Sequence, residues 1–144
     1  MPLVTRSFTQ LSDLVLHEKD PSIGYAREVV FVDVAADTAV VMGMVAFRAK
    51  AATDTSYALL SNASQLVNTN EFVVLFGDRY QAKPQGFTLL AADTADNAVG
   101  FVRDNVILKD YLMKAATSGF LNAAQFAALV HLLKEQGVIV EITI

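Results

Sequence analysis

The carboxy-terminal end of the chain carries the pattern that most restricts its fold, a capped helix that runs directly into an alternating strand. Asn122 is a favourable N-cap residue, and Gln125 three positions later completes a capping box. Gly137 supplies the left-handed residue at which helices commonly end. Apolar residues recur between these points at helical spacing, at Phe126, Leu129, Val130 and Leu133. A half-buried strand is predicted to follow, with apolar residues at Val138, Val140, Ile142 and Ile144.

Before this helix, short segments rich in β-branched and aromatic residues predict strands. They are residues 27–34, 39–47, 57–60, 71–76, 87–90, 98–103 and 106–111. Gly43 lies inside the second segment and predicts a bulge or a close backbone approach, while Gly77 and Asp78 predict a turn that ends the fourth. Asp104 and Asn105 predict a tight turn between the last two segments. The pattern as a whole predicts a mainly β fold with one well-defined C-terminal helix, a compact antiparallel β-barrel or tulip-like domain over residues 25–144.

Residues 1–24 predict a different kind of segment, an extended N-terminal arm. Pro2, Pro21 and Gly24 interrupt it, and its apolar residues are too scattered for a sustained amphipathic helix. A short helical turn or a strand over residues 13–17 is compatible with the spacing. Disordered tails are usually poorer in large apolar side chains. We therefore expect the arm to become ordered against a partner, and a frayed terminus is the alternative.

An aromatic residue and a pair of charges stand where the arm meets the first strand. These residues are Tyr25, Arg27 and Glu28. They are compatible with two interpretations, a hinge that fixes the direction in which the arm leaves the domain, and the ordinary start of an amphipathic strand.

The composition favours a protein partner over nucleic acid or membrane. Charged residues make up only 18% of the chain, and the mean hydropathy is +0.40, so a small domain has more apolar sequence than it easily buries. The formal charge is −4 and no cluster of Lys and Arg is present, which argues against phosphate binding. The longest apolar run, residues 39–47, is far shorter than the roughly 20 residues of a membrane helix. We expect a soluble, unanchored chain that forms a substantial protein–protein interface.

The residues that usually carry chemistry form no recognisable motif. The two histidines, His17 and His131, lack partners at metal-ligand spacing, and the chain has no cysteine. The serines lack the G-x-S-x-G nucleophile motif, and the glycines are isolated rather than arranged for phosphate binding. Most aspartates fall at predicted strand ends and turns, where this residue caps the backbone. We expect a protein that is not an enzyme, with no catalytic residue, metal, cofactor or small-molecule substrate.

The order of these parts resembles the lambda-type bacteriophage head decoration proteins. The segments that carry the resemblance are residues 3–9 (LVTRSFT), 13–18 (DLVLHE), 24–30 (GYAREVV), 98–106 (AVGFVRDNV) and 121–140 (LNAAQFAALVHLLKEQGVIV). Together they span nearly the whole chain in the order of the family. Residues 61–86 depart from the pattern, since they are longer than in typical members and suggest an insertion exposed on the outer surface.

The resemblance implies a structural protein of the virion. Members of this family form homotrimers that cap three-fold sites on the outside of the phage head and stabilise the shell, and their arm orders on the major capsid protein. The resemblance also implies that the chain is made in the host cytoplasm and that its final location is the outer surface of the phage head. The residues implied in capsid binding are Leu3, Val4, Thr5, Phe8, Leu11, Leu14 and Leu16. The alternatives are a small-molecule-binding β-barrel, an unrecognised hydrolase, and a tail or head-fibre module.

Overall fold

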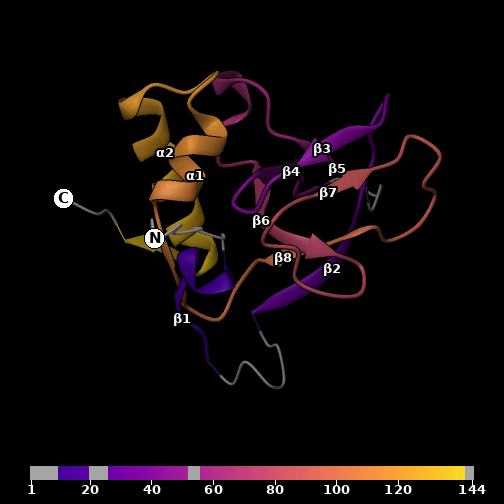
Figure 1. The fold of residues 1–144 in the computed structure, drawn as a ribbon. Coiled ribbons are helices and arrows are strands. Elements are labelled where there is room, and N and C mark those ends of the chain that lie inside the picture. The colour runs from indigo at the N-terminus through magenta and orange to yellow at the C-terminus, as the bar shows by residue number, and fades with distance from the viewer. Residues whose placement is uncertain (1–9, 20–25, 52–55, 142–144) are drawn as a thin grey trace, which may run out of the picture.

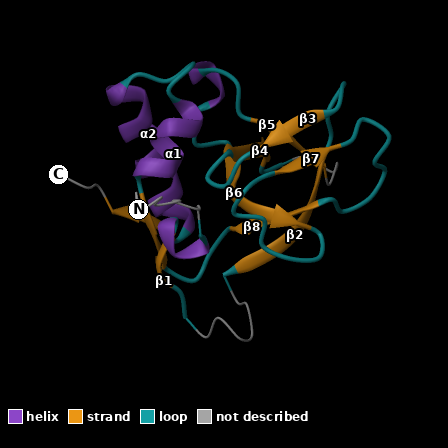
Figure 2. Ribbon diagram, in the orientation of Figure 1, coloured by secondary structure: helices purple, strands orange, loops and turns teal. Residues whose placement is uncertain are grey.

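The structure is a computed structural model that describes residues 10–19, 26–51 and 56–141. Strands predominate, and two α-helices lie near the C-terminus (Figures 1 and 2). The helices are α1 (Tyr111–Thr117) and α2 (Ala123–Gln136), and two short 3-10 turns are η1 (Leu11–Asp13) and η2 (Ala63–Gln65). The strands are β1 (Val15–His17), β2 (Arg27–Val32), β3 (Thr38–Val40), β4 (Val45–Ala49), β5 (Ser56–Leu59), β6 (Asn70–Asp78), β7 (Phe87–Leu89), β8 (Ala98–Phe101), β9 (Val106–Lys109) and β10 (Val138–Glu141).

Five of the strands close into a barrel in the order β2-β5-β4-β6-β8. Its pairs are antiparallel except β2–β5, which is parallel. A second sheet, β1-β9-β10, lies beside the barrel together with α1 and α2, and β3 pairs with β7 as a separate ribbon (Figure 2). β10 runs parallel to β9 because both helices lie between them in the chain, and parallel neighbours require such a crossover. The prediction of a mainly β fold with a barrel and a C-terminal helix is confirmed.

Strand β6 belongs to two hydrophobic cores at once. Its residues Phe72, Val74 and Phe76 pack into the core shared with α2, β9 and β10, while Val73 and Leu75 pack into the core inside the barrel. Successive side chains of a strand point to opposite faces, so a strand buried on both faces needs an unbroken apolar run. The sequence of β6 supplies that run.

The inside of the barrel is narrow, and small residues line part of it. Ala46 on β4 and Ala98 on β8 are buried there, and Gly100 on β8 faces the side chain of Val73. A Cβ atom added at Gly100 would lie 2.3 Å from Cγ2 of Val73 and 2.6 Å from the carbonyl oxygen of Val74. Glycine at this position is therefore what lets β6 and β8 pair at their normal separation.

The C-terminal pattern forms as predicted. The side chain of Asn122 accepts a hydrogen bond from the backbone N–H of Gln125, and the side chain of Gln125 accepts one from the N–H of Asn122. Gly137 ends α2 with a φ of 91°. Val138 and Val140 of β10 are buried and Glu141 is exposed, which confirms the half-buried strand as far as Glu141. The tight turn is also confirmed, since Asp104 and Asn105 both have positive φ.

Three details of the predicted order are corrected. The strand expected over residues 39–47 is two strands, β3 and β4, and Gly43 turns between them with a φ of 102° where its backbone approaches Leu112. β6 continues through Gly77 to Asp78, because an irregular register with β8 absorbs the glycine. The segment 106–111 is a strand only to Lys109, and Tyr111 already begins α1, a helix that the sequence reading missed.

The segment 61–86 is likewise not an exposed insertion. It contains all of β6, whose residues from Phe72 to Gly77 are buried between the two cores. The segment therefore contributes a buried strand of the barrel rather than an outer loop alone.

We predict that Gly100→Ala destabilises the fold by about 1–3 kcal/mol, because the added methyl group overpacks the barrel against Val73 and the backbone of β6. Gly119→Ala is the matched control, since an added Cβ there meets no atom within 4 Å, and it should change stability by less than about 0.5 kcal/mol. Urea denaturation followed by circular dichroism measures both. Equal stabilities for the two variants would contradict the packed barrel interior.

Candidate functional site

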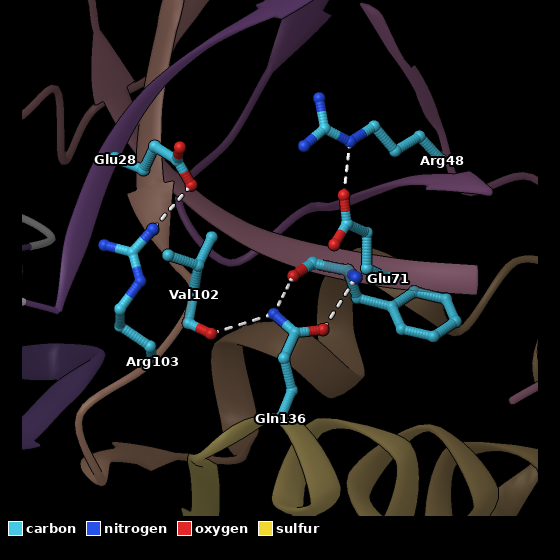
Figure 3. A network of polar contacts seen from close by, with 7 residues as sticks. Glu28, Arg48, Glu71, Val102, Arg103 and Gln136 are labelled. Atoms are coloured by element: carbon cyan, nitrogen blue, oxygen red, sulfur yellow. Dashed lines mark hydrogen bonds and ion pairs between the residues drawn. The ribbon is translucent and has the colours of Figure 1, made fainter. Parts of the chain in front are cut away.

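The inward-facing positions of the barrel strands change from apolar to charged at one end. Glu28 stands two residues before the buried Val30 on β2, and Arg48 stands two residues after the buried Ala46 on β4. Glu71 stands two residues before Val73 on β6. These side chains, with Tyr57, Val102, Arg103 and Gln136, line an open recess of about 350 Å³. Figure 3 shows all of these residues except Tyr57. The recess is the polar mouth of an otherwise apolar barrel.

Two ion pairs stand on either side of this mouth. Nη2 of Arg103 donates to a carboxylate oxygen of Glu28 at 2.8 Å, and Nε of Arg48 donates to Glu71 (Figure 3). The guanidinium of Arg48 also lies 4.5 Å from the centre of the Tyr57 ring, a cation–π contact. Burial, together with the nearby carboxylate of Glu71, raises the pKa of Tyr57 to about 12. Positive and negative groups are matched here, so the mouth carries no net charge.

Gln136, the last residue of α2, joins the helix to the barrel. Its amide nitrogen donates to the carbonyl oxygens of Phe72 and Val102, and its amide oxygen accepts from the backbone N–H of Phe72 at 2.8 Å (Figure 3). One side chain thus satisfies three backbone groups on β6 and after β8. This clamp was not predicted, because a polar residue before a helix-ending glycine has no distinctive sequence signal.

The first described segment of the chain is tied to the barrel by a third ion pair. Nε and Nη2 of Arg27 each donate to one carboxylate oxygen of Glu18, both at 2.8 Å. The guanidinium of Arg27 lies 5.0 Å from the ring centre of Phe76 and 5.7 Å from that of Phe101, and the two rings stack on each other at 4.4 Å. Glu18 is almost fully buried, and its hydrogen bond raises the pKa of Arg27. Breaking such a pair leaves a buried charge without a partner, so the contact holds residue 18 firmly to β2.

The residues predicted for the arm fall into two groups. Leu3, Val4, Thr5, Phe8 and Tyr25 lie outside the described residues. The others belong to the domain: Leu11 packs partly buried against the core, Leu14 is completely buried, and Leu16 is 51% exposed on β1. The expectation that Leu14 contacts a partner is therefore wrong.

The arm predicted over residues 1–24 is corrected in its described part. Residues 10–19 form η1 and β1, and β1 pairs with β9 in the register Val15 to Leu108. The anchor consists of this pairing, the buried Leu14 and the ion pair of Glu18 with Arg27. Only Leu16 of the predicted contact residues in this part presents an exposed side chain.

The structure favours the strand interpretation over the hinge for two of the three junction residues. Arg27 and Glu28 both lie within β2 and pair with Phe101 and Gly100 of β8. Their side chains are held by Glu18 and Arg103. They fasten the start of β2 rather than allow it to swing.

The described residues show neither a metal-binding group nor a membrane-spanning helix. Within the ranges 10–19, 26–51 and 56–141, no group of three or more His, Asp and Glu side chains is placed to hold a metal ion. In the same part of the chain, no helix has the length and apolar character needed to span a membrane. In comparisons with known proteins, no family model, curated protein or solved structure matches the chain.

We predict that Gln136→Ala lowers the free energy of unfolding by about 2 kcal/mol, because it leaves backbone groups of Phe72 and Val102 without hydrogen-bond partners. Glu135→Ala is the matched control one residue away. Glu135 is 53% exposed and pairs with the exposed His131, so its loss should cost less than about 0.5 kcal/mol. Chemical denaturation of both variants measures the difference, and a Gln136 variant as stable as the control would refute the clamp.

We predict that stability falls as the pH rises from 10 towards 12 because of Tyr57. In the unfolded chain this phenol loses its proton near pH 10, whereas in the folded protein its pKa is about 12. Between these values the unfolded state binds fewer protons, so rising pH favours unfolding. Tyrosinate absorbance during a pH titration should show a late step that Tyr57→Phe removes. A titration of Tyr57→Phe identical to that of the wild type would show that Tyr57 is not the late group.

Proposed function

We propose that this chain is a phage capsid decoration protein, which binds the outside of the head as a homotrimer at three-fold sites. Its partner is the major capsid protein, and by bridging neighbouring capsid subunits it stabilises the shell against the pressure of packaged DNA. Bridging stabilises the shell mechanically, so this function requires no catalytic residue or cofactor. The proposal begins from the resemblance of five ordered segments to the lambda-type decoration proteins.

The observation that carries the proposal is the outer face of the sheet β1-β9-β10. Val138, Val140, Val106 and Leu108 point into the core, so the alternate residues Ile107 and Ile139 point away from it. These two isoleucines are register partners, both are partly exposed, and His17 pairs with Ile107 on the other side. A sheet face turned to solvent normally carries polar residues. An apolar row at this place supports contact with another protein.

The edge of the same sheet offers a second means of contact. β1 is an edge strand of the sheet, and its register with β9 is irregular between Val15 and His17, which turns Leu16 outward. Exposed strand edges are templates for added strands from a partner. Residues 1–9 precede this anchored edge in the chain, and their apolar side chains include Leu3, Val4 and Phe8. The proposal is that this segment and the β1 edge together bind the shell.

In a trimer, a weak contact between each chain and the shell is sufficient for tight binding of the whole trimer. Once one chain of a trimer is engaged, the others act at high effective concentration, so the joint affinity can exceed that of one chain by about 10²–10⁴. Each protomer would then need only a short segment and one strand edge. A short contact segment is consistent with the anchoring of residues 10–19 to the domain, because residues 1–9 are then the part of the predicted arm that precedes the domain in the sequence.

The alternative function, a β-barrel that binds a small molecule, is supported less well. Among the described residues, the inside of the barrel is filled by side chains, among them Val30, Val32, Val73 and Leu75, which leaves little room for a ligand there. The polar mouth is open, but its charged groups are already paired with one another. A tail or head-fibre module is the other alternative, and binding to tail tubes or fibres rather than to capsids would identify it.

We predict that deleting residues 1–9 leaves a folded protein with the mass of a trimer that no longer co-sediments with cognate capsids. The deletion spares Leu14, β1 and Glu18, which hold the start of the domain. Deleting residues 1–18 instead removes a fully buried leucine and the partner of Arg27, and should unfold or strongly destabilise the domain. Light scattering, circular dichroism and co-sedimentation measure these outcomes.

A surface substitution tests the β1 edge without shortening the chain. Leu16→Lys should weaken capsid binding, whereas Val67→Lys, at another exposed apolar residue, should not. Full capsid binding by both the truncation and Leu16→Lys would overturn the proposed binding surface. A monomer that ignores capsids would overturn the function itself.

A further inference from the structure

A different hollow lies where two loops meet beside the barrel. It has a volume of about 480 Å³ and is lined by residues 78–80 from the loop after β6 and by residues 88–97 around the loop after β7. A smaller recess of about 210 Å³ shares Arg79 and residues 94–96 with it and extends to Phe31 of β2. The size falls within the usual range of small-ligand sites, about 300–1,000 Å³.

Both loops are held in shape by side chains that bind their backbone. Oδ1 of Asp78 accepts from the N–H groups of Tyr80 at 2.9 Å and Gln81 at 3.0 Å. Oδ2 of Asp93 accepts from the N–H of Leu90 at 3.2 Å, and Asn97 binds both the N–H and the carbonyl oxygen of Val32. Asp78 and Asp93 thus fix the backbone within their own loops, and Asn97 attaches the second loop to β2. A site built this way is preorganised, so little ordering is needed when a ligand binds.

The side chains directed into the solvent around the hollow have few partners of their own. Tyr80 is 83% exposed and Leu90 is 45% exposed, unusual values for such large side chains. The guanidinium of Arg79 lies 5.5 Å from the Tyr80 ring. Among the described residues, Thr94 and Asp96 line the hollow without an internal hydrogen bond. The hollow therefore combines an exposed aromatic face with donors and acceptors that are available to a ligand.

We propose that this hollow binds a carbohydrate. A sugar ring has an apolar C–H face that packs on an aromatic ring, and hydroxyl groups that each donate and accept hydrogen bonds. Tyr80 supplies the aromatic face, and Leu90 and Phe31 extend the apolar part. The Asp96 carboxylate accepts from hydroxyls, Arg79 donates, and Thr94 does both. This inference does not rest on the capsid function, because the residues belong to a different part of the molecule.

Two other ligand classes fit the lining less well. A phosphate-bearing ligand needs several cations, and Arg79 is the single cation that lines the hollow. A metal ion needs free carboxylates, but Asp78 and Asp93 are engaged with backbone N–H groups, and the described residues contain no metal-binding group. A basic peptide remains the main competitor, because three aspartates line the same space.

The test uses the full-length chain labelled with ¹⁵N and titrated with the methyl glycosides of glucose, mannose, galactose and N-acetylglucosamine. A printed array of defined bacterial oligosaccharides extends the search beyond these four sugars. We expect saturable amide shifts confined to residues 78–80 and 88–97, or binding to oligosaccharides on the array. Tyr80→Ala should weaken that binding by about 10-fold, because the stacking surface is lost. Tyr80→Phe keeps the ring and should retain binding.

Tyr111→Ala is the matched control, since Tyr111 is another exposed tyrosine and lies on α1. It should bind the sugar as the wild type does. Asp96→Asn offers a second variant that removes one acceptor charge without changing the size of the side chain. The proposal is overturned if no sugar binds, or if binding is equally strong in Tyr80→Ala. It is also overturned if a lysine-rich peptide, and no sugar, produces the shifts.

Discussion

The double burial of β6 is the constraint on which the rest of this structure depends. Residues from Phe72 to Phe76 send alternate side chains into the barrel and into the core beneath α2. A five-stranded barrel leaves little interior room, which is why its inner positions include Ala46, Ala98 and Gly100. The side chains of β6 that point out of the barrel include the large Phe72 and Phe76, which fill the space between the barrel and α2. One apolar run thus holds two layers together, and neither layer buries its apolar face without the other.

Polar contacts then fix how the ends of the chain meet this two-layer core. Gln136 attaches the end of α2 to β6, and Glu18 attaches the start of the domain to β2 through Arg27. The guanidinium of Arg27 covers the stacked rings of Phe76 and Phe101, so the ion pair also shields apolar surface on β6 and β8. The first contact joins residues 64 positions apart in the sequence, and the second joins residues nine positions apart. They specify one arrangement of the layers, whereas apolar packing alone tolerates several.

The sequence predicted those parts of the fold whose signals are local. The capping box of Asn122 and Gln125 and the left-handed Gly137 formed as expected. The predicted strand segments also formed, except that 39–47 is two strands, 71–76 continues to Asp78 and 106–111 ends at Lys109. Helix α1 was missed because Tyr111 was assigned to the preceding strand, although residues 112–116 are the strong helix formers Leu, Met, Lys and Ala.

The arm predicted over residues 1–24 included residues that belong to the domain, because the boundary between arm and domain depends on tertiary contacts. Nothing local to Leu14 tells whether its side chain packs on its own domain or on a partner. The polar mouth could not be predicted either, since it joins residues from four barrel strands, from the segment after β8 and from the end of α2. The hollow at residues 78–97 likewise depends on two loops that only the barrel brings together.

The two proposed binding surfaces, the β1 edge and the hollow at residues 78–97, lie on opposite sides of the molecule. Figure 1 shows β1 and its sheet on one side of the barrel and the loop after β7 on the other. A chain attached to a shell through the β1 edge would therefore hold the hollow away from the attachment point. The pinned loops suit that position, because Asp78, Asp93 and Asn97 keep their shape without help from a neighbouring subunit. The packed barrel lies between the two surfaces, so they share no residue. Each surface is therefore free to serve its own partner.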